Sequence, residues 1–491
     1  MKERSFYANL FFSLGLNLLV KPAAIFIIDA AVQNEVGPQY GLYFAIFNLS
    51  LILSILFDFG VNNLSTKLAA QNIDAAKQQF SSIFIFRFGL MLFYVGGLSC
   101  IHLFLKLSWN DYKLILLLGL NQFLIANIAY FRSFFAGMHW FRLDAFFSVL
   151  DRLLLIFSMG YILYIYPDGF KLVDIQMYAS LQFAGYLLTF LWAGLMLFKS
   201  IQPPLQLPNW QLIKTLVTTA FPYALLIVLM MLYTRSDAIL LGWLAGIEHA
   251  SYYAQAFRLI DALYMFAMVF AGLLLPMFAR SLHRASHNDI QVLTQQASKL
   301  LLGASIVFIV FVFFHGSFFL DIIYPQNRVW LSDILLLLSF AFFGLASNLI
   351  YGSLLTANGS LKLLNKISAI GVVLNISLNI WLLREFALFG STITALVAAL
   401  TQLLMAAIQR FYCYKLFNIR ISGRLLLQFA MLFILLSGWY LIVAFSPIGY
   451  SLGRGTLIIL DVIASFCIMA LLRFIDIKEL LKLLQNRDAM K

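Results

Sequence analysis

Residues 221–263 read FPYALLIVLMMLYTRSDAILLGWLAGIEHASYYAQAFRLIDAL, two apolar runs joined by a short polar segment. Each run approaches the roughly 20 apolar residues that an α-helix needs to cross a membrane. Four charged residues nevertheless lie inside the runs: Arg235, Asp237, Arg258 and Asp261. Ionisable side chains are costly inside a membrane and usually face a cavity or a partner. The stretch therefore predicts two membrane-spanning helices whose charged side chains meet other helices.

The whole chain repeats this apolar pattern. Of its 491 residues, 63% are hydrophobic and 11% are charged, whereas soluble domains are about 45–50% apolar and 25% charged. One water-soluble core cannot hide so much apolar surface, so the excess must face lipid. The sequence predicts an all-α, polytopic membrane protein with fourteen transmembrane helices joined by short loops. The predicted spans are residues 8–31, 41–62, 82–105, 113–136, 145–166, 176–198, 216–243, 250–275, 298–323, 331–356, 363–383, 387–411, 425–445 and 454–473.

The distribution of basic residues predicts the orientation. The formal net charge is +12, and the chain holds 33 Lys and Arg residues. With the N-terminus in the cytoplasm, 21 of them fall in or near inner loops, six in outer loops and six inside spans. Cytoplasmic loops of membrane proteins collect Lys and Arg, so we expect an inner-membrane protein with both termini cytoplasmic. The sequence has no basic face with interleaved aromatic residues, so we expect no nucleic-acid partner.

The C-terminal residues 476–491 form the predicted cytoplasmic tail. Apolar residues and lysines alternate there at helical spacing, which indicates either an amphipathic helix on the membrane surface or a simple charged stop. Elsewhere the His, Cys, Asp and Glu residues lack the spacing of metal ligands, and no large loop carries paired acids. We therefore expect no metal site, no catalytic residue and no enzyme activity.

An internal repeat is visible in two predicted outer loops. Residues 35–43 and 248–253 each begin with Glu, contain small residues and Tyr, and precede an apolar helix. Six predicted spans separate the two copies, and an even number preserves their orientation. The halves of the chain are therefore predicted to be parallel repeats, related by an axis along the membrane normal.

Three stretches carry a resemblance to a known family. They are VGPQYGLYFAIFNLSLILSILFDFGVNNLSTKLAA (36–70), the stretch 221–263 quoted above, and GVVLNISLNIWLLREFALFGSTITALVAAL (371–400). The chain resembles the multidrug/oligosaccharidyl-lipid/polysaccharide (MOP) exporter superfamily, and within it the polysaccharide transport family that holds the O-antigen-unit flippases. The predicted count of fourteen helices fits this branch.

The resemblance implies a particular arrangement of the helices. Two pseudo-symmetric six-helix bundles, residues 1–205 and 206–415, would face each other. Two extra transmembrane helices in residues 416–475 would follow, and the tail would complete the chain. The first, seventh and eighth helices would line the central cleft between the bundles.

Three cations on these three helices lie at a similar predicted depth. At a rise of about 1.5 Å per residue, Lys21 is roughly 15 Å from the outer end of its helix, and Arg235 and Arg258 are roughly 12 Å. Arg matches phosphate oxygens with a planar fork, and Lys acts as a point charge. The three residues predict a binding site for the diphosphate head of a lipid or, alternatively, salt bridges that fix helix packing. Pro22 is predicted to break the first helix beside Lys21.

Acidic residues accompany these cations. Asp261 and Arg258 are three residues apart on one helix face and can pair. Arg235 and Asp237 are two apart and point nearly opposite ways. Arg235 and Lys21 are therefore predicted to lack an anionic partner, which a diphosphate would supply. A supporting or ion-coupling role is assigned to three acids, Asp29, Asp237 and Asp261.

A second set of charges lies nearer the predicted cytoplasmic side. Its members come from predicted helices two to five: Asp58, Arg87, Arg132, Asp151 and Arg152. They indicate either an inner gate of ion pairs or long side chains that reach the inner head groups. The asparagines inside spans are predicted to form hydrogen bonds between helices. These are Asn17, Asn48, Asn348, Asn375 and Asn379.

The resemblance and the charges together predict a flippase. It would move a polyprenyl-diphosphate-linked oligosaccharide across the inner membrane by alternating access, for assembly of a surface polysaccharide such as the O-antigen of lipopolysaccharide. No cofactor is expected apart from a coupling ion, H⁺ or Na⁺. The expected partners are the lipid-linked oligosaccharide, membrane lipid and the polysaccharide polymerase machinery.

Two other transporter functions fit much of the sequence. A cation-coupled multidrug exporter of the same superfamily would favour acids in the cleft, where this chain places Lys21, Arg235 and Arg258. A peptidoglycan-precursor flippase would move the same diphosphate head with different sugars. Both remain alternatives at this point.

Overall fold

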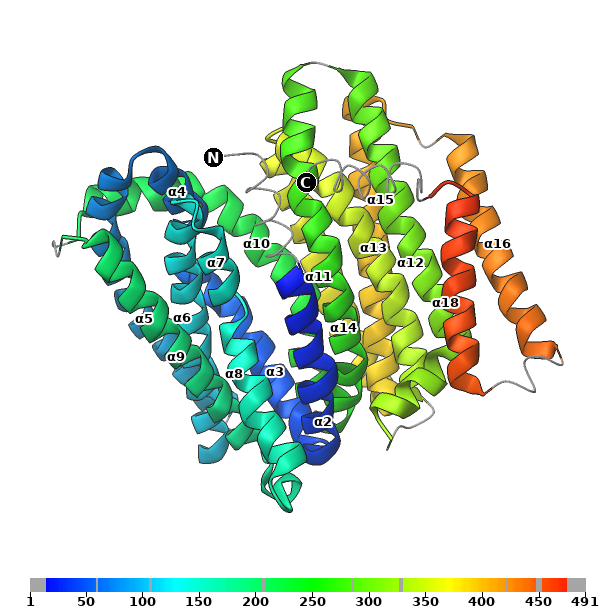
Figure 1. Cartoon of the computed structure of the whole chain (residues 1–491), viewed down its shortest axis with the longest axis horizontal. Helices are drawn as coiled ribbons and strands as arrows, with labels where there is room; N and C mark the ends of the chain where they lie inside the picture. The colour runs from blue at the N-terminus through cyan, green and yellow to red at the C-terminus, as the bar shows by residue number, and fades with distance from the viewer. Residues whose placement is uncertain are drawn as a thin grey trace, which may run out of the picture. The chain divides into compact units, whose positions relative to one another are not determined.

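The computed structural model describes most of the chain, in residues 15–58, 61–105, 108–204, 208–284, 286–325, 330–420, 422–446 and 453–474. These residues form helices and no strand (Figure 1). Fourteen helices among them are long and apolar enough to cross a membrane. Each overlaps one predicted span, so the all-α polytopic fold is confirmed. The predicted tail, residues 476–491, lies outside the described residues.

The described part of the chain is helical from its first residue into the first π-helix. The elements are η1 (Ala24–Asp29), α2 (Ala30–Val36), α3 (Gln39–Leu53), η2 (Ser54–Phe57), α4 (Val61–Gln71), α5 (Ile73–Leu105), α6 (Trp109–Gly137), α7 (Phe141–Phe147), α8 (Leu150–Gly160), η3 (Tyr161–Ile165), η4 (Gly169–Leu172), α9 (Ile175–Ile201), α10 (Trp210–Leu244), α11 (Ile247–His283), α12 (His287–Ile323), α13 (Trp330–Ala357), α14 (Leu361–Glu385), η5 (Ala387–Phe389), α15 (Gly390–Phe417), α16 (Gly423–Phe445) and α18 (Arg454–Leu471). The first, second and fifth spans change helix type along their length. These irregular spans carry many of the candidate site residues.

The first span does not break at Pro22, contrary to the prediction. Residues 15–36 are helical throughout, and the irregularity is the π-helix η1 that follows the proline. A π-helix inserts a residue into the helical register, and such bulges frequently occur at functional sites. The hydroxyl of Tyr164 donates a hydrogen bond of 3.1 Å to the carbonyl of Ile27 inside η1. The π-helix therefore sets the direction in which Asp29, its last residue, points.

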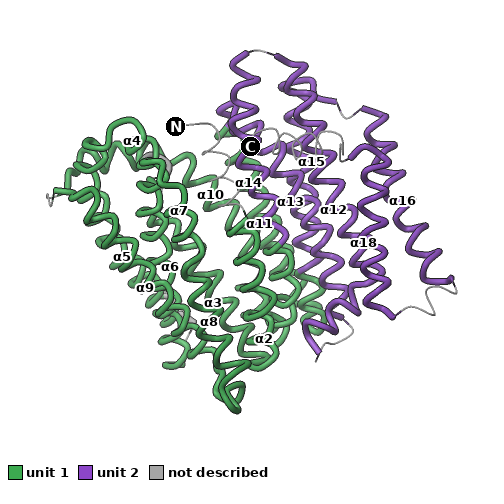
Figure 2. Tube along the Cα trace, in the orientation of Figure 1, with its two compact units in different colours: residues 1–262, 361–394 green, residues 263–360, 395–491 purple. Residues whose placement is uncertain are grey.

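The chain forms two compact units (Figure 2). Unit 1 comprises residues 1–262 and 361–394, and unit 2 comprises residues 263–360 and 395–491. Helices α11 and α15 each contribute residues to both units. The bundle boundaries at residues 205 and 415 stay a prediction.

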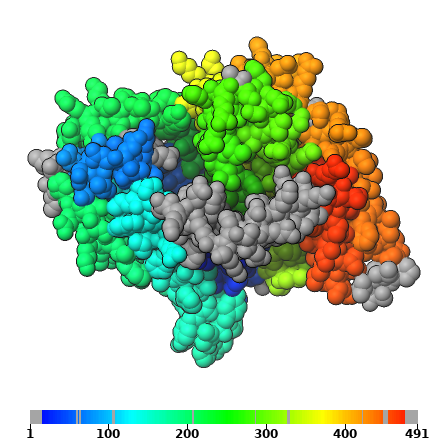
Figure 3. All heavy atoms as spheres, turned by 45° about the horizontal axis from the view of Figure 1, so that its top comes forward, coloured from blue at the N-terminus to red at the C-terminus, as the bar shows by residue number. Residues whose placement is uncertain are grey.

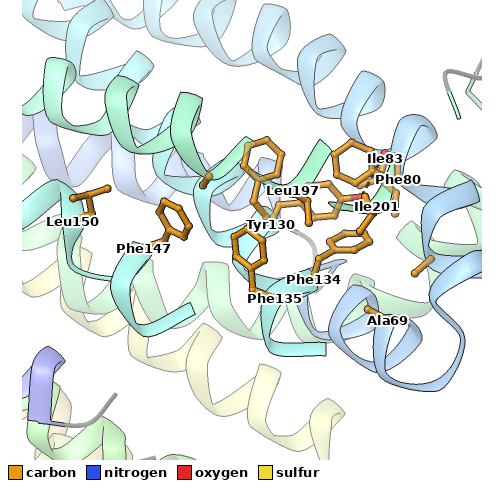
Figure 4. Close-up of a cluster of buried hydrophobic side chains, with 13 residues drawn as sticks. Ala69, Phe80, Ile83, Tyr130, Phe134, Phe135, Phe147, Leu150, Leu197 and Ile201 are labelled. Atoms are coloured by element: carbon orange, nitrogen blue, oxygen red, sulfur yellow. Dashed lines mark hydrogen bonds between the residues drawn. The ribbon is translucent and has the colours of Figure 1, made fainter. Parts of the chain in front are cut away.

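Unit 1 packs around α6 and α10. Helix α6 lies against α4 and α9, and α10 lies against α3 and α14. An aromatic core joins α4, α5, α6 and α9 (Figure 4). In this core Phe80 stacks on Tyr130 and meets Phe134 edge-on, with ring centroids 5.4 Å apart in both pairs. Because lipid is as apolar as these side chains, close van der Waals packing holds such helices together.

An exposed lobe, residues 161–172, projects from unit 1. It contains η3 and η4 and is the blue-green projection at the bottom of Figures 1 and 3. Tyr161, Tyr164 and Phe170 are large exposed side chains of this lobe. Aromatic side chains are enriched where membrane meets water, which marks the lobe as one end of the membrane-spanning part of unit 1.

Unit 2 packs around α12. Helix α12 lies against α13, α16 and α18, and α18 also lies against α16. The buried carboxylate of Asp461 in α18 lies 2.7 Å from Nε2 of His315 in α12 and accepts a hydrogen bond of 2.8 Å from Nε1 of Trp439 in α16. These bonds tie the last two spans to α12 inside the apolar layer.

Candidate functional site

Four charged side chains from three spans form one connected network in unit 1. Arg235 of α10 donates two hydrogen bonds to Asp261 of α11, with Nη2–Oδ1 and Nη1–Oδ2 distances of 2.9 and 3.2 Å. Nη1 of Arg258 lies 3.7 Å from Oδ2 of Asp261. Nε of Arg258 lies 3.4 Å from Oδ2 of Asp29 in η1. Two cations thus share two carboxylates, and the charges within this network sum to zero.

Tyrosine hydroxyls hold this network in place. Tyr40 accepts a hydrogen bond of 3.1 Å from Nε of Arg258, and Tyr178 donates a hydrogen bond to Asp29. Both tyrosine side chains are fully buried. The guanidinium of Arg258 also lies over the ring of Phe47, 5.2 Å from its centroid, a cation–π contact. Sequence reasoning missed these residues because the chain has 22 Tyr and 49 Phe, and nothing in the sequence separates these few from the rest.

The structure corrects one prediction about these charges and agrees with another. Arg235 does not lack an anion, because Asp261 of the neighbouring helix supplies it. The pairing of Arg258 with Asp261 follows the predicted three-residue spacing. No ion pair joins Arg235 to Asp237 in the part of the chain that the structure describes, as expected for residues two apart in a helix.

Asp237 is buried among hydrogen-bond donors instead of beside a cation. Its Oδ1 accepts from Nδ2 of Asn379 at 2.9 Å, and its Oδ2 accepts from the hydroxyl of Tyr253 at 3.2 Å. Ser236 donates to Oδ1 of Asn375 at 3.2 Å, and Asn379 also donates to the Asn375 carbonyl at 3.0 Å. Asp237 has no ion pair within the described ranges. A buried carboxylate that meets hydrogen-bond donors and no cation is chemically suited to take up a positive charge, such as a proton.

Lys21 belongs to a second group of charges. Its electrostatic neighbours are Arg132, Arg152, Asp151 and Asp144. Its side chain is partly buried, and no described carboxylate lies within 4.0 Å of its ammonium group. These neighbours are two cations and two carboxylates, and Arg152 also interacts electrostatically with Asp29 of the first network. The structure therefore gives Lys21 charged neighbours that differ from those of Arg235.

The residues of the predicted inner gate form separate pairs. Nε of Arg132 in α6 lies 2.7 Å from Oδ1 of Asp144 in α7, and Nε of Arg152 lies 3.4 Å from Oδ2 of the adjacent Asp151. Among the described residues no ion pair joins one of these pairs to the other. Sequence reasoning missed Asp144, because it lies twelve residues after Arg132 beyond a turn, where no spacing rule applies.

Arg87 makes the contacts of a packing residue. Its side chain is 1% exposed and donates to the carbonyl of Ala126 and to Oδ1 of Asn62, each at 2.8 Å. Its guanidinium lies over the ring of Tyr130, 4.5 Å from the centroid, and 3.7 Å from Oδ1 of Asp58. Arg87 thus joins α4, α5 and α6 and does not extend to the inner head groups.

The two loops predicted to be repeats meet in unit 1. A Cβ atom at Gly41 would lie 1.9 Å from the carbonyl oxygen of Ile247 and 2.7 Å from the backbone nitrogen of Ser251. The hydroxyl of Ser251 donates to the carbonyl of Gly37 at 3.0 Å. The first turns of α3 and α11 are therefore in backbone contact, which only a residue without a side chain allows at position 41.

Four of the five asparagines form the predicted hydrogen bonds between helices. The pairs are Asn17 with Ser148, Asn348 with Gln402, Asn375 with Ser236, and Asn379 with Asp237. The prediction for Asn48 is wrong, because its amide donates to the carbonyl of Phe44 within its own helix.

A bundle of fourteen apolar helices with charged networks buried inside it is the architecture of a polytopic membrane transporter. The family model for polysaccharide biosynthesis proteins matches residues 6–282, more than half of the chain. The chain therefore belongs to the polysaccharide biosynthesis protein family. No curated protein sequence matches it significantly.

Solved structures show the same fold at low sequence identity. An inward-facing MATE family multidrug resistance transporter of the MOP superfamily has a TM-score of 0.65 and 12% identity, covering 83% of this chain and 98% of that one. The lipid II flippase MurJ in an inward closed conformation has a TM-score of 0.65 and 13% identity, covering 97% and 99%. A variant of the Vibrio cholerae MATE transporter VcmN has a TM-score of 0.56 and 15% identity, covering 84% and 96%. The fold is that of the MOP superfamily, which confirms the predicted resemblance.

Proposed function

We propose that this protein is a flippase for a polyprenyl-diphosphate-linked oligosaccharide used in surface polysaccharide assembly. The family match, whose model describes polysaccharide biosynthesis proteins, supports the polysaccharide part of the proposal. The MOP fold supports the transport part. A soluble sugar does not need intramembrane cations, whereas a diphosphate head does.

The observation that carries the proposal is Lys21. It is a cation inside the first span whose ammonium group has no carboxylate within 4.0 Å among the described residues, and two of its four charged neighbours are also cations. A cation inside a membrane is stable only with an anion or water nearby. A diphosphate would supply that anion, and Arg132 and Arg152 of the same group would add charge-assisted hydrogen bonds.

Arg235 and Arg258 are proposed as later contacts of the same head group. In this structure Asp261 and Asp29 form ion pairs with them and neutralise their charge. A diphosphate that displaces Asp261 would find two guanidinium groups already oriented toward one place. Binding of the head group would therefore require the ion pairs of this network to rearrange. Such a change of conformation on binding is what alternating access requires.

The backbone contact at Gly41 supports a proposal about the conformational state. In the predicted orientation, with cytoplasmic termini in the inner membrane, this contact lies at the outer end of unit 1. It would close that end, and its opening would release the head group outward. The MATE and MurJ structures with the same fold are described as inward-facing and inward closed.

Asp237 is proposed as the site of ion coupling. It has hydrogen-bond donors and no ion pair in the described ranges, so a proton or Na⁺ bound there would remove an uncompensated charge. We further propose the O-antigen polymerase machinery as the consumer of the flipped lipid.

The proposal is tested by transport in liposomes. The purified protein is reconstituted with a fluorescent polyprenyl-diphosphate oligosaccharide, and its translocation is compared for wild type, Lys21→Gln and Lys21→Arg. Loss of one charge-assisted contact of about 1.5–3 kcal/mol should lower binding at least tenfold, and Arg should restore it. Lys171→Gln in the exposed lobe is the matched control.

Three outcomes of this assay would separate the alternatives. Wild-type transport with full activity of Lys21→Gln would show that Lys21 is not the head-group site. Transport of lipid II with no transport of other diphosphate-linked sugars would identify a peptidoglycan-precursor flippase. Extrusion of cationic dyes without any lipid transport would establish a multidrug exporter and overturn the proposal.

A further inference from the structure

A buried polar seam runs between α12, α13 and α15 in unit 2. Four side chains in it are between 1% and 6% exposed, although each carries an oxygen atom. They are Ser298, Asn348, Tyr351 and Gln409. The seam lies inside helices whose other neighbours are apolar, and it takes no part in the charged networks of unit 1.

Helices α13 and α15 run parallel along this seam. A Cβ atom at Gly344 would lie 2.7 Å from the carbonyl carbon of Gln402, and one at Gly352 would lie 3.2 Å from Oε1 of Gln409. Nδ2 of Asn348 donates to Oε1 of Gln402 at 2.9 Å. The residue numbers of the contacting positions increase in the same direction along both helices. The polar groups therefore lie along one line between the helices.

Each of the four residues has a polar atom without a partner. Among the described residues no hydrogen bond reaches the hydroxyl oxygens of Ser298 and Tyr351 or the amide oxygens of Asn348 and Gln409. The hydroxyls of Ser298 and Tyr351 lie near each other but make no hydrogen bond with acceptable geometry. Buried polar groups in native proteins are satisfied by protein or by ordered water.

One end of the seam reaches an exposed charge. Arg410 follows Gln409 in α15, is exposed, and acts electrostatically on Tyr351. Cys413, one turn further, is fully buried and its thiol lies 3.7 Å from the carbonyl of Tyr351. The polar line thus runs from the exposed Arg410 end to the pair Asn348 and Gln402.

We propose that this seam binds a file of internal water molecules that enters unit 2 from the Arg410 end. Water is the ligand that matches the site, because it both donates and accepts and can join oxygens that do not reach one another. A dry seam would leave four polar atoms unpaired in an apolar layer. The file gives unit 2 a polar path into the membrane that the substrate networks of unit 1 do not share.

Radiolytic footprinting of the full-length protein in liposomes tests this inference. A short X-ray pulse makes hydroxyl radicals from water, and only side chains next to water are oxidised; mass spectrometry then gives the rate for each residue. Tyr351 should be oxidised several-fold faster than Tyr130, which is about equally buried but lies in the aromatic core of unit 1 (Figure 4). Equal protection of Tyr351 and Tyr130 would overturn the proposal.

A variant of matched shape provides the second measurement. Ser298→Ala removes one water contact beside Tyr351 and leaves the volume nearly unchanged, so the oxidation rate of Tyr351 should fall several-fold. The low rate of the buried Tyr130 should stay unchanged, which shows that the variant is folded. An unchanged Tyr351 rate in this variant would mean that labelling comes from opening of the bundle and not from a bound file, and would also overturn the proposal.

Discussion

Arg235 and Asp261 face each other across α10 and α11 and are joined by two hydrogen bonds, of 2.9 and 3.2 Å. The two parallel bonds fix the guanidinium plane against the carboxylate. The same carboxylate also lies 3.7 Å from Arg258. Asp261 is therefore the acid on which both arginines of the candidate site depend.

Substitution Asp261→Asn should destabilise the protein by about 3 kcal/mol, because it leaves two nearly buried arginines with one carboxylate. Thermal unfolding in detergent measures the effect. Asp168→Asn is the control, since its ion pair with Lys171 is more than half exposed on both sides and such pairs contribute little. Equal unfolding temperatures for wild type and Asp261→Asn would contradict the structural role given to this pair.

Substitution Asp237→Asn should abolish the response of transport to an ion gradient. The amide keeps the size of the side chain, but it takes up no proton near neutral pH and carries no negative charge to hold Na⁺. Lipid binding, which does not involve Asp237, should persist. Transport in liposomes under an imposed H⁺ gradient and, separately, an imposed Na⁺ gradient measures the loss and identifies the ion. Asp289→Asn at an exposed position of α12 is the control. A variant that still responds to both gradients would exclude Asp237 as the coupling site.

Substitution Gly41→Ala should destabilise the state seen here by about 1–3 kcal/mol, because the new methyl group overlaps the backbone of α11. Gly89→Ala in α5 has open space around it and should be neutral or stabilising by about 0.5–1 kcal/mol. Accessibility of a cysteine placed near residue 41 to a water-soluble reagent should rise only in Gly41→Ala. No difference between the two variants would argue against a closed backbone contact at this end.

Substitution Asp461→Ala should loosen the last two spans from α12. It leaves the Nε1 group of Trp439 and the imidazole of His315 buried without their acceptor, at a cost of about 1–3 kcal/mol. A double-mutant cycle with Trp439→Phe, read by thermal unfolding, should show a coupling energy of about 0.5–3 kcal/mol. Additive effects of the two substitutions would mean that the hydrogen bond of 2.8 Å contributes nothing to stability.

Local spacing predicted those parts of the site that lie within one helix. The pairing of Arg258 with Asp261 and the opposed directions of Arg235 and Asp237 follow from 3.6 residues per turn. The shared face of Asn375 and Asn379 follows from the same rule, and it brings Asn379 to Asp237 and Asn375 to the adjacent Ser236. These relations need no knowledge of how helices pack.

Contacts between helices were beyond the reach of the sequence. Depth along the first, seventh and eighth helices suggested that Lys21 joins Arg235 and Arg258, yet its charged neighbours are Arg132, Arg152, Asp144 and Asp151. Depth gives one coordinate, whereas a contact also needs the rotation of each helix about its axis and its lateral neighbours. The π-helix η1 changes that rotation in the first span, and no residue pattern predicted this π-helix.

The sequence by itself determined that this chain is a membrane protein of fourteen helices, because the transfer of apolar side chains into lipid depends on composition and length alone. It also determined which helices carry charge. Which charges neutralise one another followed only from the fold, because an ion pair depends on distances of a few ångströms between side chains far apart in the chain. In the fold Arg235 pairs with Asp261, Asp237 is buried beside Asn379, and Lys21 has no carboxylate within 4.0 Å among the described residues.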